Sequence, residues 1–200
     1  MLVLDLFCGT QSLKPIIQEK GWDYIGLDIE EIHKPDICID FLDWDYKTIK
    51  PDIIWASPDC SCYSMANGGK HFDKDRNPKT EKAIMHLKIL NKLKECINYH
   101  ISENKKLIYF IENPTARMVW FINEYPRYDV SYCKYGCDRM KPTTIWSNVK
   151  GFIPKKCKNS NPDCHHIKAP RGSRKGTEAI PKHERYKVPY QLLSELFSLI

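Results

Sequence analysis

Short apolar runs alternate with longer segments of helical periodicity along most of the chain. The apolar runs have the length of buried strands. They cover residues 1–7, 23–29, 36–42, 52–57, 106–113 and 127–136. Residues 12–21 and 80–104 instead repeat their apolar positions every three or four residues, as amphipathic helices do. This alternation predicts an α/β fold in which a mostly parallel sheet carries helices on both faces.

The composition changes after Tyr135 toward Lys, Arg, Pro, Cys and His. Residues 136–187 are therefore predicted to form a basic, loop-rich region. The apolar stretch 188–200 predicts a C-terminal helix that packs back on the sheet. Because 200 residues suffice for one sizeable core, we expect a single domain over 1–200, with its core in 1–135.

Apolar run length, cysteine count and net charge exclude few classes of protein. No apolar run is long enough to cross a bilayer, and the acid inside the first run argues against a signal peptide, so we expect an intracellular protein. Nine cysteines, an odd number, favour free thiols, a catalytic thiol or a metal site over a disulfide framework. The net charge of +6 mildly favours a polyanionic partner, and a solvated basic face is an equally good interpretation.

Polar residues follow the first three predicted strands, at the edge where ligands bind in open sheets of this class. Gly9 in "DLFCGTQS" suits a tight turn that a ligand can approach. Asp28 follows at the interval where an acid commonly binds ribose hydroxyls, and Asp40 ends the third run. Because Gln11 stands where a dinucleotide loop has a second glycine, a cofactor without phosphates is favoured. Taken singly, Gly9 could serve a plain strand-to-helix turn and Asp40 a cap.

The next two strand ends carry a thiol and an acid. "SPDCSCYS" places Cys60 after the fourth run, where local dipoles and cations can activate a thiol. Cys62 faces elsewhere if the segment is extended, and we interpret it as a packing residue. Glu112 ends the fifth run in "IENP", where Pro114 keeps Asn113 extended or lets it cap a helix. A Cys and a Glu at neighbouring strand ends can act as nucleophile and proton donor on one heteroaromatic ring.

In this order, these motifs resemble those of the cytosine 5-methyltransferases that use S-adenosylmethionine, especially the compact orphan forms of phages and other viruses. "DLFCGT" resembles the cofactor loop of that family, "GLDI" and "CIDFLDW" its ribose and adenine acids, and "SPDCSCYS" its PPCQ-x-F-S loop. "ENP" is similar to its ENV tripeptide and "CDRMK" to its Q-x-R-x-R motif. The resemblance covers nearly the whole chain, more weakly at "HERYKVPYQLLSEL". It implies a Rossmann-like class I methyltransferase sheet without a full target-recognition domain.

The resemblance also implies roles for individual residues. Cys60 matches the nucleophile, Glu112 its partner at the base, and Arg139 the first arginine of the last motif. Lys141 replaces the second arginine, and Cys137 replaces the glutamine. The implied cofactor-binding residues are Asp5, Phe7, Gly9, Thr10, Gln11, Ser12, Asp28, Ile29, Asp40, Phe41 and Pro58.

The cofactor roles follow the family pattern. Phe7 would stack on the adenine ring and Gly9 would line the methionine part. Asp28 would hold the ribose, and Asp40 would meet the adenine amino group.

The implied activity is transfer of a methyl group from S-adenosylmethionine to carbon 5 of cytosine in DNA, with S-adenosylhomocysteine as product. Cys60 would attack carbon 6 of a flipped base. The DNA is expected to be double-stranded. Because the large recognition domain has no room in the chain, specificity should be short or loose, and a protein partner or oligomer could assist binding. The basic segment Lys155 to Lys187 could contact phosphates or be a solvated loop. The expected compartment is the cytoplasm, that of the host cell if the protein is viral.

Two departures from the family motif and two other functions remain open. Asp59 replaces the usual proline before the nucleophile and Ser61 the glutamine after it. An acid beside the thiol opposes thiolate formation unless its side chain points away. The same chemistry could act on RNA or a free cytosine nucleotide. Alternatively, a catalytically silent protein could keep the fold for DNA binding or regulation.

Soft metal ligands gather after the sixth apolar run. They are Cys133, Cys137, Cys157, Cys164, His165 and His166. A single zinc could hold this region, with Cys133, Cys137, Cys157 and Cys164 as its ligands. Because the spacings do not match a paired C-x-x-C knuckle, we predict no metal and interpret these residues as free cysteines and exposed histidines.

Overall fold

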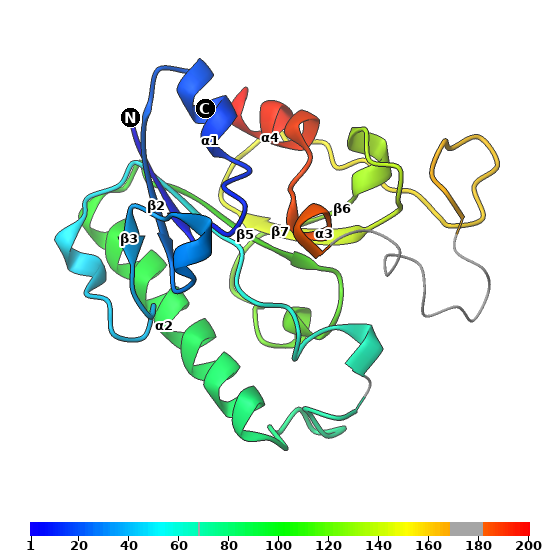
Figure 1. Cartoon of the computed structure of the whole chain (residues 1–200), viewed down its shortest axis with the longest axis horizontal. Helices are drawn as coiled ribbons and strands as arrows, with labels where there is room; N and C mark the ends of the chain where they lie inside the picture. Colours follow the sequence, from blue (N-terminus) through cyan, green and yellow to red (C-terminus); the bar gives the residue numbers. More distant parts are fainter. Residues whose placement is uncertain (68, 169–181) are drawn as a thin grey trace.

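The computed structural model describes residues 1–67, 69–168 and 182–200 (Figure 1). Within these residues, one sheet has the strand order β3-β2-β1-β4-β5-β7-β6. The strands are β1 (Leu2–Leu6), β2 (Asp23–Asp28), β3 (Ile37–Cys38), β4 (Ile53–Ala56), β5 (Ile108–Pro114), β6 (Arg127–Ser131) and β7 (Pro142–Ser147). The first five strands pair in parallel, whereas β7 is antiparallel to both of its neighbours, β5 and β6. The carboxyl ends of β1, β2, β4, β5 and β6 therefore lie at the same edge of the sheet.

Helices cover both faces of the sheet (Figure 1). The helices α1 (Lys14–Glu19) and α4 (Tyr190–Phe197) lie on one face, and the long α2 (Glu81–Glu103) lies on the other. The short α3 (Lys182–Tyr186) precedes α4. Single-turn 3-10 helices occur at η1 (Glu31–His33), η2 (Tyr46–Thr48), η3 (Met65–Asn67), η4 (Arg117–Trp120) and η5 (Tyr132–Tyr135).

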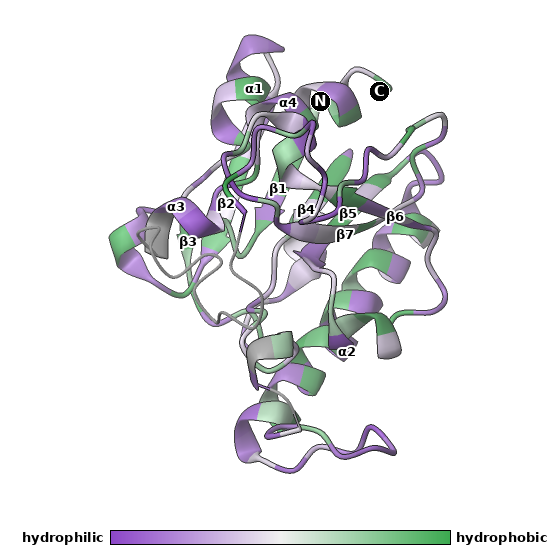
Figure 2. Ribbon diagram, turned by 90° about the vertical axis from the view of Figure 1, so that its right-hand side faces the viewer, coloured by the Kyte–Doolittle hydropathy of each residue, from purple (hydrophilic) through white to green (hydrophobic). Residues whose placement is uncertain are grey.

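Strand alternation divides the buried residues into two cores. Val3, Ile53 and Phe110 belong to the cluster that contains α1 and α4. Residues one position further along, such as Ile54 and Ile111, belong to the cluster that contains α2. This is the consequence of side chains pointing to opposite faces at successive strand positions. Figure 2 shows the matching pattern on α2, where hydrophobic and hydrophilic residues recur along the helix.

The structure confirms the predicted α/β class and the mostly parallel sheet with helices on both faces. The expectation of loops over 136–187 is wrong for residues 142–147, which form β7 between two other strands. Thr143 and Thr144 are fully buried there, and the Thr144 hydroxyl donates to Asp129 Oδ1 at 3.0 Å. A weakly apolar run can therefore serve as an inner strand because its neighbours satisfy its hydroxyls. Of the basic segment Lys155 to Lys187, residues 169–181 lie outside the described part.

The third predicted strand is shorter than its apolar run. Residues 36–42 predict a full strand, but β3 contains only Ile37 and Cys38. Phe41 turns instead into the core, where it is 3% exposed. None of the described helices has the length and apolar character needed to cross a membrane.

The C-terminal helix should contribute much of the stability of the fold. Phe197 is fully buried, with its ring centroid 5.7 Å from that of Phe110 and 6.4 Å from that of Trp55. We expect Phe197→Ala to lower the free energy of unfolding by about 3 to 5 kcal/mol, because it opens a cavity against the sheet. Urea denaturation measures this. Leu199→Ala, at a 42% exposed position, is the control and should stay within about 0.5 kcal/mol of wild type. Equal losses in both variants would contradict the packing role of α4.

Candidate active site

A cleft of about 1520 Å³ opens at the carboxyl ends of the central strands. Its walls combine residues from the loops after β1, β2, β4 and β5 with residues of the connection between β6 and β7. The predicted site residues that line it are Asp5, Phe7, Gly9, Thr10, Ser12, Asp28, Ile29, Asp40, Phe41, Pro58, Cys60, Glu112 and Arg139. Residues more than 100 positions apart in sequence thus meet in one cavity, because parallel strands end at one edge.

Gln11 is the predicted site residue that does not line this cleft. Its amide nitrogen donates to the carbonyls of His33, at 2.6 Å, and Lys34, at 3.0 Å. Its amide oxygen accepts a hydrogen bond from Lys14 Nζ at 3.0 Å. Gln11 therefore holds the η1 turn against the start of α1, and the prediction that it contacts the cofactor is not supported.

The loop after β1 has an unusual backbone. Phe7, Gly9 and Gln11 all have positive φ angles, of 60°, 46° and 53°. For Phe7 and Gln11 this left-handed conformation costs roughly 1–2 kcal/mol each, since a Cβ crowds the following carbonyl. The Asp28 carboxylate holds the loop, because Oδ2 accepts a hydrogen bond from the Gly9 N–H at 2.8 Å. Its Oδ1 accepts from the Glu30 N–H at 2.9 Å.

An aromatic pair and a second acid complete this half of the cleft. The rings of Phe7 and Phe41 contact each other with centroids 4.9 Å apart. Asp40 accepts a hydrogen bond from the Leu42 N–H at 2.8 Å, so one carboxylate oxygen fixes the turn after β3. Ile29 is 62% exposed at the rim. This half therefore presents apolar flat surfaces beside two carboxylates.

Asp5 is a buried carboxyl group under this loop. It is 1% exposed, and Oδ2 accepts a hydrogen bond from the Tyr24 hydroxyl at 2.8 Å. Burial raises the pKa of Asp5 to about 7, although the Tyr24 hydrogen bond opposes the rise, and the charge of Asp28 adds to it. Asp5 thus changes its protonation state near neutral pH.

The loop that carries Cys60 is tied to the neighbouring strand. Asn113 donates from Nδ2 to the Pro58 carbonyl at 2.8 Å, and Asn113 is 1% exposed. The Cys60 carbonyl accepts hydrogen bonds from the N–H groups of Tyr63, at 3.0 Å, and Ser64, at 2.9 Å, which closes a tight turn. Asn113 therefore places the loop rather than capping a helix. The sequence signal was present in "ENP", but the partner of Asn113 could not be read from it.

Cys62 is buried in the core on the α2 side of the sheet. It is 1% exposed and belongs to the same cluster as Tyr63 and Phe72. The interpretation of Cys62 as a packing residue is confirmed. Cys60, by contrast, is half-buried in the cleft wall.

Asp59 has hydrogen-bond and charge partners in its own loop and on α2. Its two oxygens accept hydrogen bonds from the N–H and the hydroxyl of Ser61, at 2.8 and 2.7 Å. Oδ2 also lies 3.5 Å from His86 Nε2 and 3.7 Å from Lys82 Nζ on α2. Burial opposes ionisation, but the Ser61 hydrogen bonds and these neighbouring charges hold the pKa of Asp59 below its ordinary value. The acid is therefore ionised, with partners of its own.

Glu112 is a buried carboxylate at the end of β5. It is 6% exposed, and Oε1 accepts a hydrogen bond from the Tyr132 hydroxyl at 2.8 Å. Lys141 Nζ lies 3.8 Å from the same oxygen. Neither of these two contacts uses Oε2, which leaves that atom for a ligand in the cleft. Burial raises the pKa of Tyr132 well above its ordinary value, as does the Glu112 charge, so Tyr132 stays a proton donor.

Cys60 titrates under the influence of three charges. Burial raises the pKa of the Cys60 thiol, Asp59 and Glu112 raise it further, and Lys141 lowers it. Lys141 is therefore the cation that favours the thiolate. The sequence identified Lys141 only as a replacement for an arginine, and it gave no signal for Tyr132.

Residues 132–141 connect β6 to β7 and carry the remaining candidates. Arg139 is half-buried in the cleft wall, as the prediction of a catalytic position requires. Cys137 also lines the cleft and lies apart from the other soft ligands. Those that gather are Cys133, Cys157, Cys164 and His166. His166 is 3% exposed, so the expectation of exposed histidines is wrong for it, whereas His165 is exposed.

Comparison with known proteins gives one relative along the whole chain. The chain is 34% identical over 220 aligned residues to a probable DNA (cytosine-5)-methyltransferase of Frog virus 3 (isolate Goorha), and the match covers all of both proteins. No model of a protein family matches the chain.

Among solved structures, the methyltransferase EhMeth of Entamoeba histolytica is similar in fold. The TM-score is 0.53 at 22% identity, over 79% of this chain. The chain spans only 57% of that protein. The likeness places the sheet and its helices in the Rossmann-like class I methyltransferase fold.

The buried Asp5 predicts a pH-dependent stability. Its pKa is higher in the folded chain than its ordinary value of 3.8, so the folded state binds the extra proton and stability falls as pH rises toward 7. Asp5→Asn removes the titration and keeps an acceptor for Tyr24. The measured quantity is the difference in unfolding free energy, wild type minus Asp5→Asn. We expect this difference to decrease by about 1 to 3 kcal/mol from pH 5 to pH 8. Urea denaturation at each pH measures it, and parallel pH curves for the two proteins would contradict the assignment.

The position of Lys141 predicts the reactivity of Cys60. Because the thiol pKa is raised, alkylation of Cys60 by iodoacetamide should rise about tenfold per pH unit between pH 7 and pH 9. Lys141→Gln should slow it at pH 8 by on the order of threefold, since the thiolate loses its cation. Mass spectrometry of the peptide that contains Cys60 gives the rate. The exposed Lys106→Gln is the control. An unchanged rate in Lys141→Gln would rule out this influence.

Proposed function

The chain belongs to the DNA (cytosine-5)-methyltransferase family, and we propose that it transfers a methyl group from S-adenosylmethionine to carbon 5 of cytosine in DNA. S-adenosylhomocysteine is the second product. The observation that carries the proposal is the joining of Cys60 and Glu112 with ten of the eleven expected cofactor residues in one cleft. We further propose that residues 1–200 act as a single methyltransferase domain, because the sheet takes strands from residues 2 to 147 and α4 packs on it.

The cofactor half of the cleft fits S-adenosylmethionine. Phe7 offers an apolar ring surface to the adenine with the buried Phe41 packed against it, and Asp28 offers acceptors to the ribose hydroxyls. Each Asp28 oxygen already accepts one backbone N–H, so the carboxylate is held in place and keeps further lone pairs for a ligand. Asp40 is the proposed acceptor for the adenine amino group, while Gly9, Thr10 and Ser12 line the wall beside them. Bound there, S-adenosylmethionine supplies an electrophilic methyl group.

Cys60 acts as the nucleophile. Its thiolate forms a bond to carbon 6 of the cytosine, and the electron pair of the 5,6 double bond moves to carbon 5, which becomes able to accept a methyl group. After the transfer a base removes the carbon 5 proton, the double bond forms again, and the thiolate leaves. Lys141 supports the first step because its charge favours the thiolate.

Glu112 orients the base and stabilises the adduct. Tyr132 and Lys141 hold Oε1, so Oε2 would meet the base, accepting from the exocyclic amino group or, when this carboxyl group carries a proton, donating that proton to ring nitrogen 3. A proton placed at nitrogen 3 draws electrons from the ring and makes carbon 6 easier to attack. Arg139 in the cleft wall would contact the base carbonyl or the flanking phosphate.

A double-stranded DNA substrate is consistent with the charges around the cleft. Lys82, Lys141, Arg185 and Lys187 line it together with Arg139. Such cations bind phosphates and make affinity sensitive to salt. Extrusion of the cytosine costs a few kcal/mol, which phosphate contacts can offset.

Cys60→Ala tests the reaction. Unmethylated double-stranded DNA of mixed sequence is incubated with S-adenosylmethionine, and 5-methyldeoxycytidine is measured by nucleoside mass spectrometry. We expect product with wild type and with the control Cys38→Ser, at an exposed cysteine outside the cleft wall. The rate should fall by at least roughly 10³-fold in Cys60→Ala, because the covalent step is lost.

A second measurement identifies the bond itself. DNA that contains 5-fluorocytosine cannot release a carbon 5 proton, so the Cys60 adduct should remain covalently attached and be detectable by mass spectrometry. Methylation of RNA or of free cytosine nucleotide in place of DNA would move the assignment to those substrates. Cofactor binding without product on any of the three would favour a silent DNA-binding or regulatory protein.

A further inference from the structure

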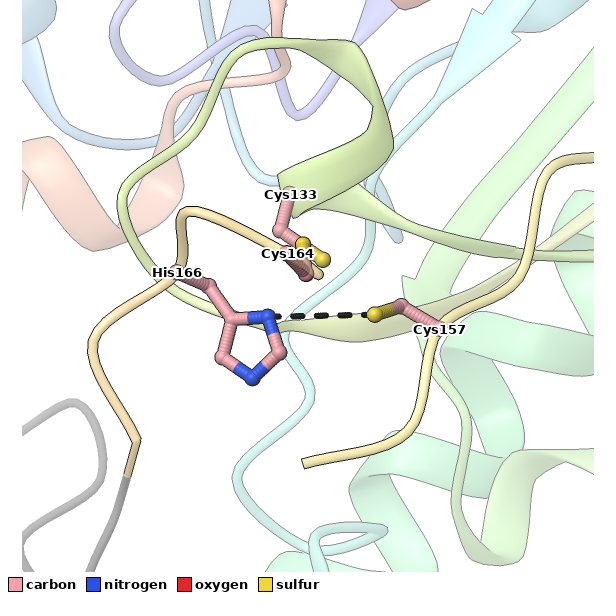
Figure 3. A group of neighbouring side chains, drawn as sticks. All are labelled: Cys133, Cys157, Cys164 and His166. Carbon is pink, nitrogen blue, oxygen red and sulfur yellow. Dashed lines mark hydrogen bonds between the residues drawn. The ribbon is translucent and has the colours of Figure 1, made fainter. Parts of the chain in front are cut away.

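Four metal-binding side chains converge outside the active site (Figure 3). One donor atom from each of Cys133, Cys157, Cys164 and His166 lies within 4.8 Å of every other. Figure 3 shows the sulfur atoms of Cys133 and Cys164 beside each other and the sulfur of Cys157 facing the imidazole ring. The distance from Cys157 Sγ to His166 Nδ1 is 3.7 Å. Ligands of a tetrahedral zinc ion, at about 2.3 Å for sulfur and 2.0–2.1 Å for nitrogen, are separated by roughly 3.6–3.8 Å.

We propose that these three cysteines and one histidine bind a structural Zn²⁺ ion. The set is a Cys₃His site, one of the common structural zinc types, and it leaves no open position for catalysis. The proposal does not depend on the methyltransferase reaction.

The hydrogen bonds around the cluster prepare the donor atoms for a metal. His166 Nε2 lies 3.3 Å from the Asn159 carbonyl oxygen, which can only accept, so Nε2 carries the proton. In the neutral ring Nδ1 then has a free lone pair, and it points to Cys157. Asn161 Nδ2 donates to Cys157 Sγ at 3.6 Å, which fixes the position of the sulfur. A carbonyl partner on the far nitrogen is the usual arrangement of a zinc-bound histidine.

The segment that carries three of the ligands is held by polar contacts and buries few apolar side chains. Residues 153–168 form neither helix nor strand, and His166 is the one buried side chain among them. The two isoleucines of the segment, Ile153 and Ile167, are 80% and 54% exposed. Ordering a polar segment of this length costs much conformational entropy. Very little apolar surface is buried here to offset that cost. Metal bonds to Cys157 near the start of the segment and to Cys164 and His166 near its end would add stabilisation to these polar contacts.

The cluster also joins the segment to the active site. Cys133 on η5 directly follows Tyr132, whose hydroxyl holds Glu112. The Ile167 N–H donates to the Asp138 carbonyl at 2.8 Å. Asp138 lies in the connection between β6 and β7, which also carries Arg139 and Lys141 of the cleft wall. A zinc ion would therefore crosslink η5 to the segment that covers it, and Cys133 would act as a positioning residue for Tyr132.

Metal analysis of the full-length protein tests the proposal. Protein purified without chelators should contain about one zinc per chain by inductively coupled plasma mass spectrometry. Cys164→Ala and His166→Ala should lose most of it. Cys137→Ala and His165→Ala are the matched controls, because they lie in the same segments but outside the cluster, and they should keep it. His166→Cys should also keep it, since Cys₄ is an equally good zinc site.

Cobalt substitution keeps the test valid if the ligand variants fail to fold. Wild-type protein reconstituted with Co²⁺ should show the visible and near-ultraviolet bands of a tetrahedral ion bound by several thiolates. Absence of both zinc and these bands would overturn the proposal. So would a disulfide between two of the three cysteines, three freely reactive thiols in native protein, or equal zinc loss in the control variants.

Discussion

The buried carboxylate of Glu112 is the constraint on which the arrangement of the site depends. A carboxylate that is 6% exposed is costly unless donors and a cation surround it. Tyr132 and Lys141 supply these, and both come from the connection between β6 and β7. That connection reaches Glu112 because β7 inserts antiparallel between β5 and β6, which brings the end of β6 to the same edge as the end of β5. The strand order of the sheet therefore decides which side chains reach Glu112.

The two halves of the cleft are held by different means. In the cofactor half, the Asp28 carboxylate holds a strained loop through the Gly9 N–H, so one acid both shapes the loop and faces the cavity. In the target half, Asn113 ties the Cys60 loop to β5 through the Pro58 carbonyl. Both anchors are side chains at strand ends that bind the backbone of the loop after the neighbouring strand. These two anchors preorganise both halves of the cleft.

The acid before Cys60 shows how the chain accommodates a departure from the family motif. The charge of Asp59 raises the pKa of the Cys60 thiol and so opposes thiolate formation. Ser61, which is itself a departure from the motif, donates its N–H and its hydroxyl to Asp59, and Lys82 on α2 adds positive charge near Oδ2. The two substitutions are therefore coupled, and the thiol relies on Lys141 for its own cation.

The sequence by itself determined the α/β class, the long α2 helix, most strands and the edge at which the chemistry lies, because periodicity and strand-end motifs are local properties of the chain. It also identified Cys60 and Glu112 through short motifs. Tertiary structure alone decided the rest. Residues 142–147 became an inner strand that pairs with β5 and β6, and the Gln11 amide donates to the carbonyls of His33 and Lys34. Tyr132 became the partner of Glu112, and His166 rather than Cys137 joined the cysteine cluster, because contacts between residues 9 to 33 positions apart depend on how the connections fold and not on spacing in the sequence.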